Sequence, residues 1–136
     1  MEQHIIHYPL LPQRELNTIY NAIDVLCFPT TRKGESLGLV GLEAMACGTP
    51  VIGSTMGGLL DYIEDGVNGF LFQPGSEEDL ASKIKRYFSL TDVEREHMSD
   101  AAKRTAHRYD TELIKPQLIN IFHSIRDTKW LRDDQP

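Results

Sequence analysis

Three short apolar runs, separated by stretches of helical periodicity, constrain the fold of this chain more than any other feature. The runs cover residues 24–28, 50–53 and 70–72, and turn-forming residues close each of them. Short strands without polar alternation are typical of a parallel sheet that is buried on both faces. Strands that alternate with helices along the sequence indicate βαβ units. We therefore predict an α/β fold with a Rossmann-like parallel sheet covered by helices.

Helical periodicity accounts for most of the remaining sequence. Apolar spacing predicts helices over about 14–22, 37–47 and 57–63, together with a brief strand at 5–6. Two capping boxes, at 76–79 and 91–94, predict the starts of two further helices, and the second helix should reach about residue 107. A last helix contains Pro116, which either sits in its first turn or kinks it. We expect one domain over residues 1–126 and a polar tail over 127–136.

Composition limits the ligands that the chain can take. Its 136 residues carry a net charge of −6, which disfavours binding to a nucleic-acid backbone. Cys27 and Cys47 each lie in an apolar run, which predicts two buried thiols in a reducing compartment. Neither has a second Cys or His at ligand spacing, so we expect no metal site. The sequence shows no signal peptide and no spanning segment, and we expect a cytoplasmic protein.

Segment 35–52 joins two carboxylates to the predicted start of a helix. Glu35 and Glu43 stand eight positions apart, on either side of a turn of small residues. The N–H groups of Leu37, Gly38 and Leu39 would point out of the helix start, where free donors and the helix dipole favour a phosphate. Glu43 could accept hydrogen bonds from a ribose diol, and Glu35 from hydroxyls beyond the phosphate. A nucleotide sugar would fit this pattern.

The same two acids also have a simpler interpretation. An acid before a helix is favoured by the helix dipole, and an acid on an exposed helix face needs no ligand. The residues by themselves leave both interpretations open.

The order and spacing of four motifs are those of a known family. The motifs are Asp24-Val-Leu-Cys-Phe-Pro29, Glu35-Ser-Leu-Gly-Leu-Val-Gly-Leu-Glu43-Ala-Met-Ala-Cys-Gly-Thr-Pro-Val-Ile52, Gly57-Gly58 and Asp65-Gly-Val-Asn-Gly-Phe-Leu71. Together they resemble the C-terminal, donor-binding domain of the retaining GT-B glycosyltransferases of the group 1 family (family 4), whose two glutamates form an E-x7-E motif. Leu37 departs from the usual Phe, and Asp61 from the usual Glu. The resemblance implies the second half of a GT-B C-terminal domain.

The resemblance also implies roles for single residues. Glu35 would be the catalytic residue that contacts the donor sugar, and Glu43 would hold the ribose hydroxyls. The other donor-binding positions would be the phosphate turn and the segment that lines the base: Ser36, Leu37, Gly38, Leu39, Tyr8 and Leu10. Family members use a nucleotide diphosphate sugar as donor substrate and usually need no metal, so we expect no cofactor.

The family's acceptor-binding N-terminal domain has no counterpart in this sequence. The first strands of the donor domain, with the Arg and Lys that neutralise the leaving diphosphate, are also missing. We therefore expect the donor-binding portion of a hexosyltransferase that retains configuration, inactive without the missing domain or a partner subunit. Any peripheral contact with a membrane would come through the absent regions. Two alternatives stay open: a non-catalytic nucleotide-binding or assembly module, and a sugar-nucleotide epimerase of similar architecture.

Overall fold

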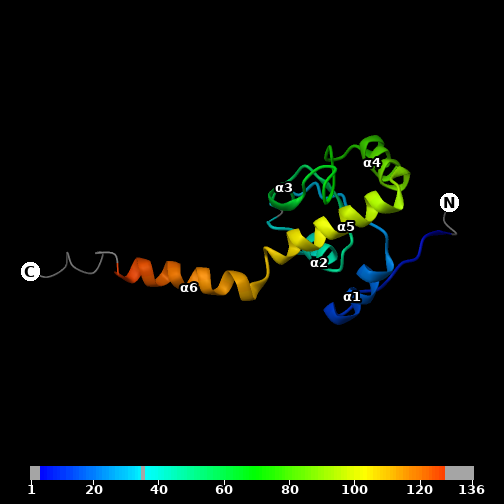
Figure 1. The fold of residues 1–136 in the computed structure, drawn as a ribbon. Coiled ribbons are helices and arrows are strands. Elements are labelled where there is room, and N and C mark those ends of the chain that lie inside the picture. Colours follow the sequence, from blue (N-terminus) through cyan, green and yellow to red (C-terminus); the bar gives the residue numbers. More distant parts are fainter. Residues whose placement is uncertain (1–3, 35, 128–136) are drawn as a thin grey trace, which may run out of the picture. The chain divides into compact units, whose positions relative to one another are not determined.

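The computed structural model describes residues 4–34 and 36–127 of the chain. Figure 1 shows the elements, which in chain order are α1 (Gln13–Ala22), β1 (Leu26–Phe28), α2 (Leu39–Ala46), β2 (Val51–Ser54), α3 (Leu59–Tyr62), β3 (Gly69–Phe72), α4 (Glu77–Ser89), α5 (Asp92–His107) and α6 (Thr111–Asp127). The chain divides into two compact units, Met1–Ala106 and His107–Pro136. The predicted tail at 127–136 lies, except for Asp127, outside the described residues, and the domain bounds stay a prediction.

The strands form one parallel sheet in the order β1-β2-β3. This confirms the predicted parallel sheet. Alternate residues of β2 and β3 face opposite sides, because successive side chains of a strand point to opposite faces. On one face Ile52 and Phe70 pack with side chains of α4 and α5. On the other face Gly53 leaves room for Ile63, the residue that follows α3, because a Cβ there would lie 2.6 Å from Ile63 Cδ1.

The helices that follow the sheet begin as their capping motifs predict. The Ser76 hydroxyl accepts a hydrogen bond from the Asp79 N–H at 3.1 Å, at the start of α4. At the start of α5, Thr91 Oγ1 accepts from the Glu94 N–H, and Glu94 Oε2 accepts from the Thr91 N–H at 2.7 Å. Each cap satisfies donors that a helix leaves open at its first turn.

Two expectations are wrong: the strand at residues 5–6 and the burial of the two thiols. Residues 5–6 form no strand, because a strand needs a neighbour to pair with, and their side chains are exposed. Cys27 is exposed rather than buried. It pairs with Ile52 on the face that α4 covers, but β1 is one of the two edge strands, and α4 packs mainly on β2 and on β3, the opposite edge. Cys47 is only partly buried.

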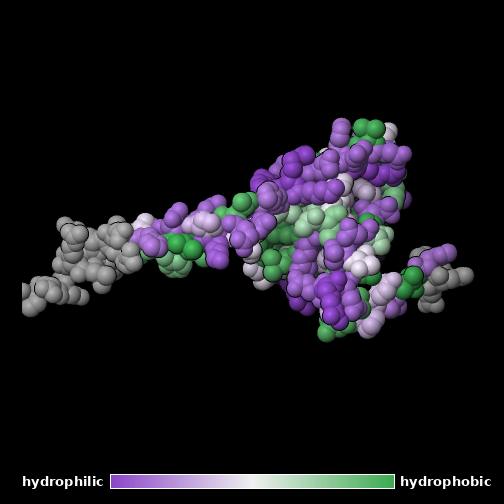
Figure 2. Space-filling model, turned by 60° about the horizontal axis from the view of Figure 1, so that its bottom comes forward, coloured by the Kyte–Doolittle hydropathy of each residue, from purple (hydrophilic) through white to green (hydrophobic). Residues whose placement is uncertain are grey.

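The second unit is built on α6, which has a strongly apolar surface. Figure 2 shows hydrophobic side chains between hydrophilic ones along this helix. The exposed large apolar residues of α6 are Leu113, Ile114, Leu118, Ile119, Ile121, Phe122 and Ile125. Pro116 lies inside α6, beyond its first turn. Among the described residues, no helix is both long enough and apolar enough to cross a membrane.

Candidate donor site at the carboxyl edge of the sheet

The loops that follow β1 and β2 meet at one edge of the sheet. In open parallel sheets, ligands bind beyond the carboxyl ends of the strands. Here the Ser54 hydroxyl, at the end of β2, donates a hydrogen bond to the Thr30 carbonyl at 2.7 Å, just after β1. The loop after β1 continues through Arg32 and Lys33, which are exposed, to the start of α2. The fold thus brings the predicted phosphate turn to the edge where a ligand is expected.

The turn before α2 has an unusual backbone that depends on glycine. Gly38 is the N-cap of α2 and has left-handed backbone angles, with φ 70° and ψ 54°. A side chain there would be strained, and it would also clash with Leu59 and Phe28. This conformation delays the helix to Leu39, two residues later than the sequence pattern predicts. The amide of Leu39 therefore opens the first helical turn, and the amides of Leu37 and Gly38 belong to the turn before it.

A pocket of about 360 Å³ lies against this turn. Its lining consists of the last residue of β1, the turn before α2 and the first two residues of α2: Phe28, Ser36, Leu37, Gly38, Leu39 and Val40. Four of the predicted donor-binding residues therefore line a single concave surface. Backbone N–H groups at a helix start carry partial positive charge, so the surface suits a negatively charged group.

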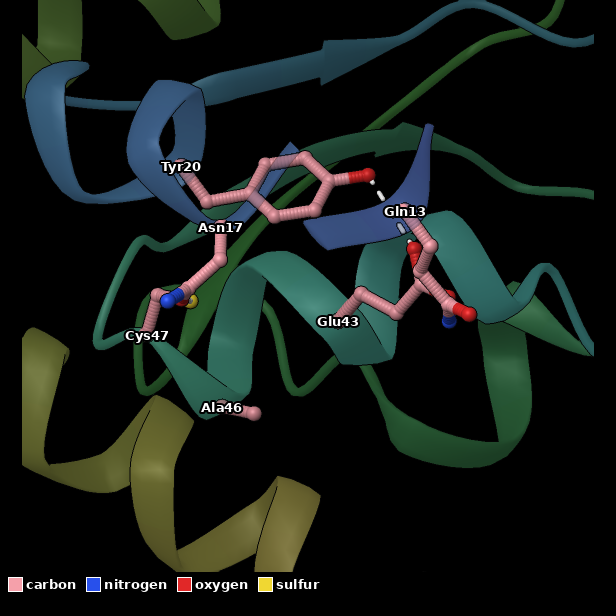
Figure 3. Close-up of a pocket in the computed structure, with 6 residues that line it drawn as sticks. All are labelled: Gln13, Asn17, Tyr20, Glu43, Ala46 and Cys47. Atoms are coloured by element: carbon pink, nitrogen blue, oxygen red, sulfur yellow. Dashed lines mark hydrogen bonds between the residues drawn. The ribbon is translucent and has the colours of Figure 1, made fainter. Parts of the chain in front are cut away.

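Glu43 lies one helical turn beyond Leu39, about 6 Å along the axis of α2. Its carboxylate is half-buried and receives hydrogen bonds from α1 (Figure 3). Gln13 Nε2 donates to Glu43 Oε1 at 2.8 Å, and the Tyr20 hydroxyl donates to Glu43 Oε2 at 3.2 Å. Each carboxylate oxygen therefore accepts one hydrogen bond from α1 and retains capacity to accept another.

A second pocket, of about 230 Å³, adjoins this carboxylate. Figure 3 shows its six lining residues, which come from facing surfaces of α1 and α2: Gln13, Asn17, Tyr20, Glu43, Ala46 and Cys47. The Cys47 thiol donates to Asn17 Oδ1 at 3.1 Å. The pocket is therefore lined largely by polar side chains that already bond to one another.

Tyr20 is the buried residue of this group, and its ionisation is suppressed. Burial raises the pKa of the Tyr20 phenol above its ordinary value, and the negative charge of Glu43 and the hydrogen bond to it raise the pKa further. The phenol therefore stays protonated at neutral pH and acts as a hydrogen-bond donor.

The predicted site residues fall into three groups. The turn residues and Glu43 lie on one short helix and its N-terminal turn. Glu35, the predicted catalytic residue, lies outside the described residues. Tyr8 and Leu10 are exposed and line neither of the two pockets. Their base-lining role stays a prediction.

Sequence reasoning missed the contribution of α1 to the site. Gln13, Asn17 and Tyr20 are spaced i, i+4 and i+7, which places three polar side chains on one face of a helix. Such a polar stripe was the available signal. Elsewhere, in the part of the chain that the structure describes, no group of three or more His, Cys, Asp or Glu side chains could hold a metal ion.

Comparison with known proteins assigns the family. Residues 1–105 match the family described as glycosyl transferases group 1, and the chain belongs to this family. It is 36% identical over 114 residues to the D-inositol 3-phosphate glycosyltransferase of Corynebacterium urealyticum, covering 84% of this chain and 26% of that protein. The chain thus spans about a quarter of the length of the relatives that it matches. The predicted resemblance to the group 1 glycosyltransferases is confirmed.

Solved structures agree with this assignment. Anabaena HepE in complex with UDP has a TM-score of 0.73 and 33% identity, over 78% of this chain and 29% of that one. A further structure of the Anabaena protein contains UDP-glucose. Sucrose-phosphate synthase from Thermosynechococcus elongatus has a TM-score of 0.77 and 28% identity, over 85% of this chain and 28% of that one. The structural neighbours are GT-B glycosyltransferases, as the sequence motifs led us to expect.

Proposed function

We propose that this chain is the donor-binding portion of a retaining glycosyltransferase whose donor substrate is a nucleoside diphosphate sugar, and that it acts without a metal. One observation carries the proposal. A half-buried carboxylate, Glu43, lies one helical turn beyond Leu39, on the helix that follows the phosphate turn at Gly38. A nucleoside diphosphate carries its ribose diol and its distal phosphate at a comparable separation, so one ligand would engage both.

Each group then has a defined task. Glu43 accepts hydrogen bonds from the ribose hydroxyls, and Gln13 and Tyr20 hold its carboxylate in place. The amides of Gly38 and Leu39 donate to the distal phosphate and stabilise the negative charge that develops on it as the glycosidic bond breaks. Glu35 contacts the donor sugar, and Tyr8 and Leu10 contact the base.

Transfer requires groups beyond this chain. An acceptor has to be held against the sugar carbon, and the leaving diphosphate needs more positive charge than two amides supply. We propose that an acceptor domain or a partner subunit provides both, and that the chain alone binds donor without transferring sugar. A non-catalytic binding module would differ only in remaining inactive when that partner is present.

Calorimetry tests the binding step. Titrating the full chain with UDP, GDP and ADP should reveal binding of at least one of them, and removing the phosphates, as in the nucleoside, should abolish it. UDP is the first probe, because the Anabaena relative binds it. Absence of binding to all three would overturn the proposed function. With UDP-glucose and no partner, we expect no sugar transfer and no epimerised product; rapid turnover would contradict the dependence on a partner.

A further inference from the structure

Two carbonyl groups of the phosphate turn accept hydrogen bonds from α3 and its N-cap residue. The Tyr62 hydroxyl donates a hydrogen bond to the Gly38 carbonyl at 2.9 Å. The Gly58 N–H donates to the Ser36 carbonyl at 2.7 Å. Tyr62 is buried, with 1% of its surface exposed. These contacts fix the rotation of two peptide groups in a turn that otherwise lies at the surface.

A hydrogen bond that fixes the direction of a carbonyl also fixes the direction of the N–H in the same peptide group. All described peptide bonds are trans, and in a trans peptide the C=O and the following N–H point in opposite directions. Since the Gly38 carbonyl points towards Tyr62, the Leu39 N–H points away from Tyr62. The Ser36 carbonyl sets the Leu37 N–H in the same manner. The Gly41 N–H donates to the same Gly38 carbonyl at 2.9 Å, so Tyr62 and the backbone of α2 together set the direction of the Leu39 amide at the first turn of the helix.

The Tyr62 hydroxyl has space only because residue 41 of α2 is glycine, which lowers the stability of that helix. Gly41 lies inside the helix, where glycine is less favourable than alanine. A Cβ at Gly41 would lie 2.1 Å from the Tyr62 oxygen, a separation that no real contact tolerates. The glycine is thus required by the position of the hydroxyl, and the two residues form a matched pair.

The other end of Tyr62 is also held. Asn68 is buried, and its side-chain amide donates to the Tyr62 carbonyl at 2.7 Å and to Thr105 Oγ1 at 2.9 Å. The backbone of Tyr62 is therefore tied to α5, while its hydroxyl reaches the phosphate turn. Because both its backbone and its hydroxyl form hydrogen bonds, Tyr62 can hold the Gly38 carbonyl without rearrangement.

We propose that Tyr62 is a positioning residue for the diphosphate of the donor. It acts through the Gly38 carbonyl and directs the Leu39 amide towards the distal phosphate. This inference rests on the proposed function, and it adds a residue that the family motif does not include. It makes a specific prediction: the hydroxyl matters for ligands with a distal phosphate and not for those without one.

The test compares UDP with UMP in wild type and in Tyr62→Phe, by calorimetry on the full chain. Loss of one buried hydrogen bond should weaken UDP binding about three- to tenfold and leave UMP binding unchanged. Tyr87→Phe is the matched control, because the Tyr87 hydroxyl donates to the Asp24 carbonyl at 2.7 Å, away from the turn. This control should leave the ratio of UDP to UMP affinity at the wild-type value.

Hydrogen exchange gives a readout that needs no ligand. The Leu39 and Val40 amides should exchange faster in Tyr62→Phe than in Tyr87→Phe. An unchanged UDP/UMP ratio together with unchanged exchange would overturn the role of Tyr62 while leaving donor binding intact. If wild type bound no nucleoside diphosphate at all, the proposed function would fall first and the inference with it, so the two failures are distinguishable.

Discussion

The phenol of Tyr20 donates a hydrogen bond to the carboxylate of Glu43 across 3.2 Å, although the two residues lie on different helices. Gln13 donates to the other carboxylate oxygen. A free glutamate side chain has many rotamers, and ordering it upon ligand binding costs conformational entropy. In this chain α1 orders the side chain before any ligand arrives. The carboxylate of α2 is therefore preorganised by a neighbouring helix.

Glu43→Ala should weaken UDP binding about 10- to 100-fold, because hydrogen bonds to a charged group contribute about 1.5–3 kcal/mol. The same variant should bind 2′,3′-dideoxy-UDP as well as wild type does, since that ligand has no hydroxyls to lose. Calorimetry with both ligands measures the two effects. Glu78→Ala removes an exposed acid of α4 and should leave both affinities unchanged. If Glu43→Ala lowered both affinities equally, Glu43 would not be the ribose contact.

Alkaline pH should destabilise the protein through Tyr20. The folded-state pKa of this phenol is raised by burial and by Glu43, so the unfolded state loses its proton first as the pH rises. The contribution of Tyr20 to stability is therefore complete at neutral pH and declines above about pH 10, the ordinary pKa of tyrosine. Urea unfolding between pH 8 and 11 should show this decline, and Tyr20→Phe should reduce its slope. An equal slope in the variant would argue against the raised pKa. Tyr87, whose pKa burial also raises, should account for part of the remainder.

Ser76→Ala should lower the free energy of unfolding by about 1 kcal/mol, because it removes the side-chain cap of α4. Ser82→Ala is the matched control, since Ser82 is exposed within the same helix and alanine is favourable there. Thermal or urea unfolding of both variants measures the difference. A loss as large in the control would show that the hydroxyl of Ser76 has no special role.

Asn68→Ala should destabilise the fold by about 2–3 kcal/mol. The substitution leaves the Tyr62 carbonyl and the Glu64 N–H without the amide that bonds to both, inside the protein. Urea denaturation provides the measurement, and Asn120→Ala, on the exposed surface of α6, should change stability by less than about 0.5 kcal/mol. A loss below about 1 kcal/mol for Asn68→Ala would indicate that neighbouring groups replace its hydrogen bonds.

The sequence pattern predicted the elements of the sheet and its helices, because periodicity and capping act locally. The cap at Ser76 needs only residues within one turn. The start of α2 was predicted two residues early, because the pattern continues through Leu37 and the left-handed backbone of Gly38 is not visible in it. The prediction of a strand at 5–6 was wrong for a related reason, since a strand forms only where a partner strand is available, whatever its own residues are.

Contacts between distant segments were the part that the sequence did not reveal. Exposure of Cys27 follows from the place of β1 at the sheet edge opposite the one that α4 covers, and an apolar run looks the same at a covered and at an uncovered edge. The bond from Tyr20 to Glu43 and the match between Gly41 and Tyr62 each depend on how two helices pack. The polar residues on one face of α1 indicated a contact such as the Tyr20–Glu43 bond. No local pattern indicated the contact between Gly41 and Tyr62.

The register of the sheet has a consequence for how the chain folds during synthesis. Leu26 pairs with Val51, and Val51 pairs with Gly69, so the paired residues lie 25 and 18 positions apart in the sequence. The entropic cost of closing such connections grows only slowly with their length. The strands also follow one another across the sheet in the order in which the ribosome makes them. The three described strands can therefore all pair once Phe72 has emerged, and α4 and α5 then cover a face that already exists.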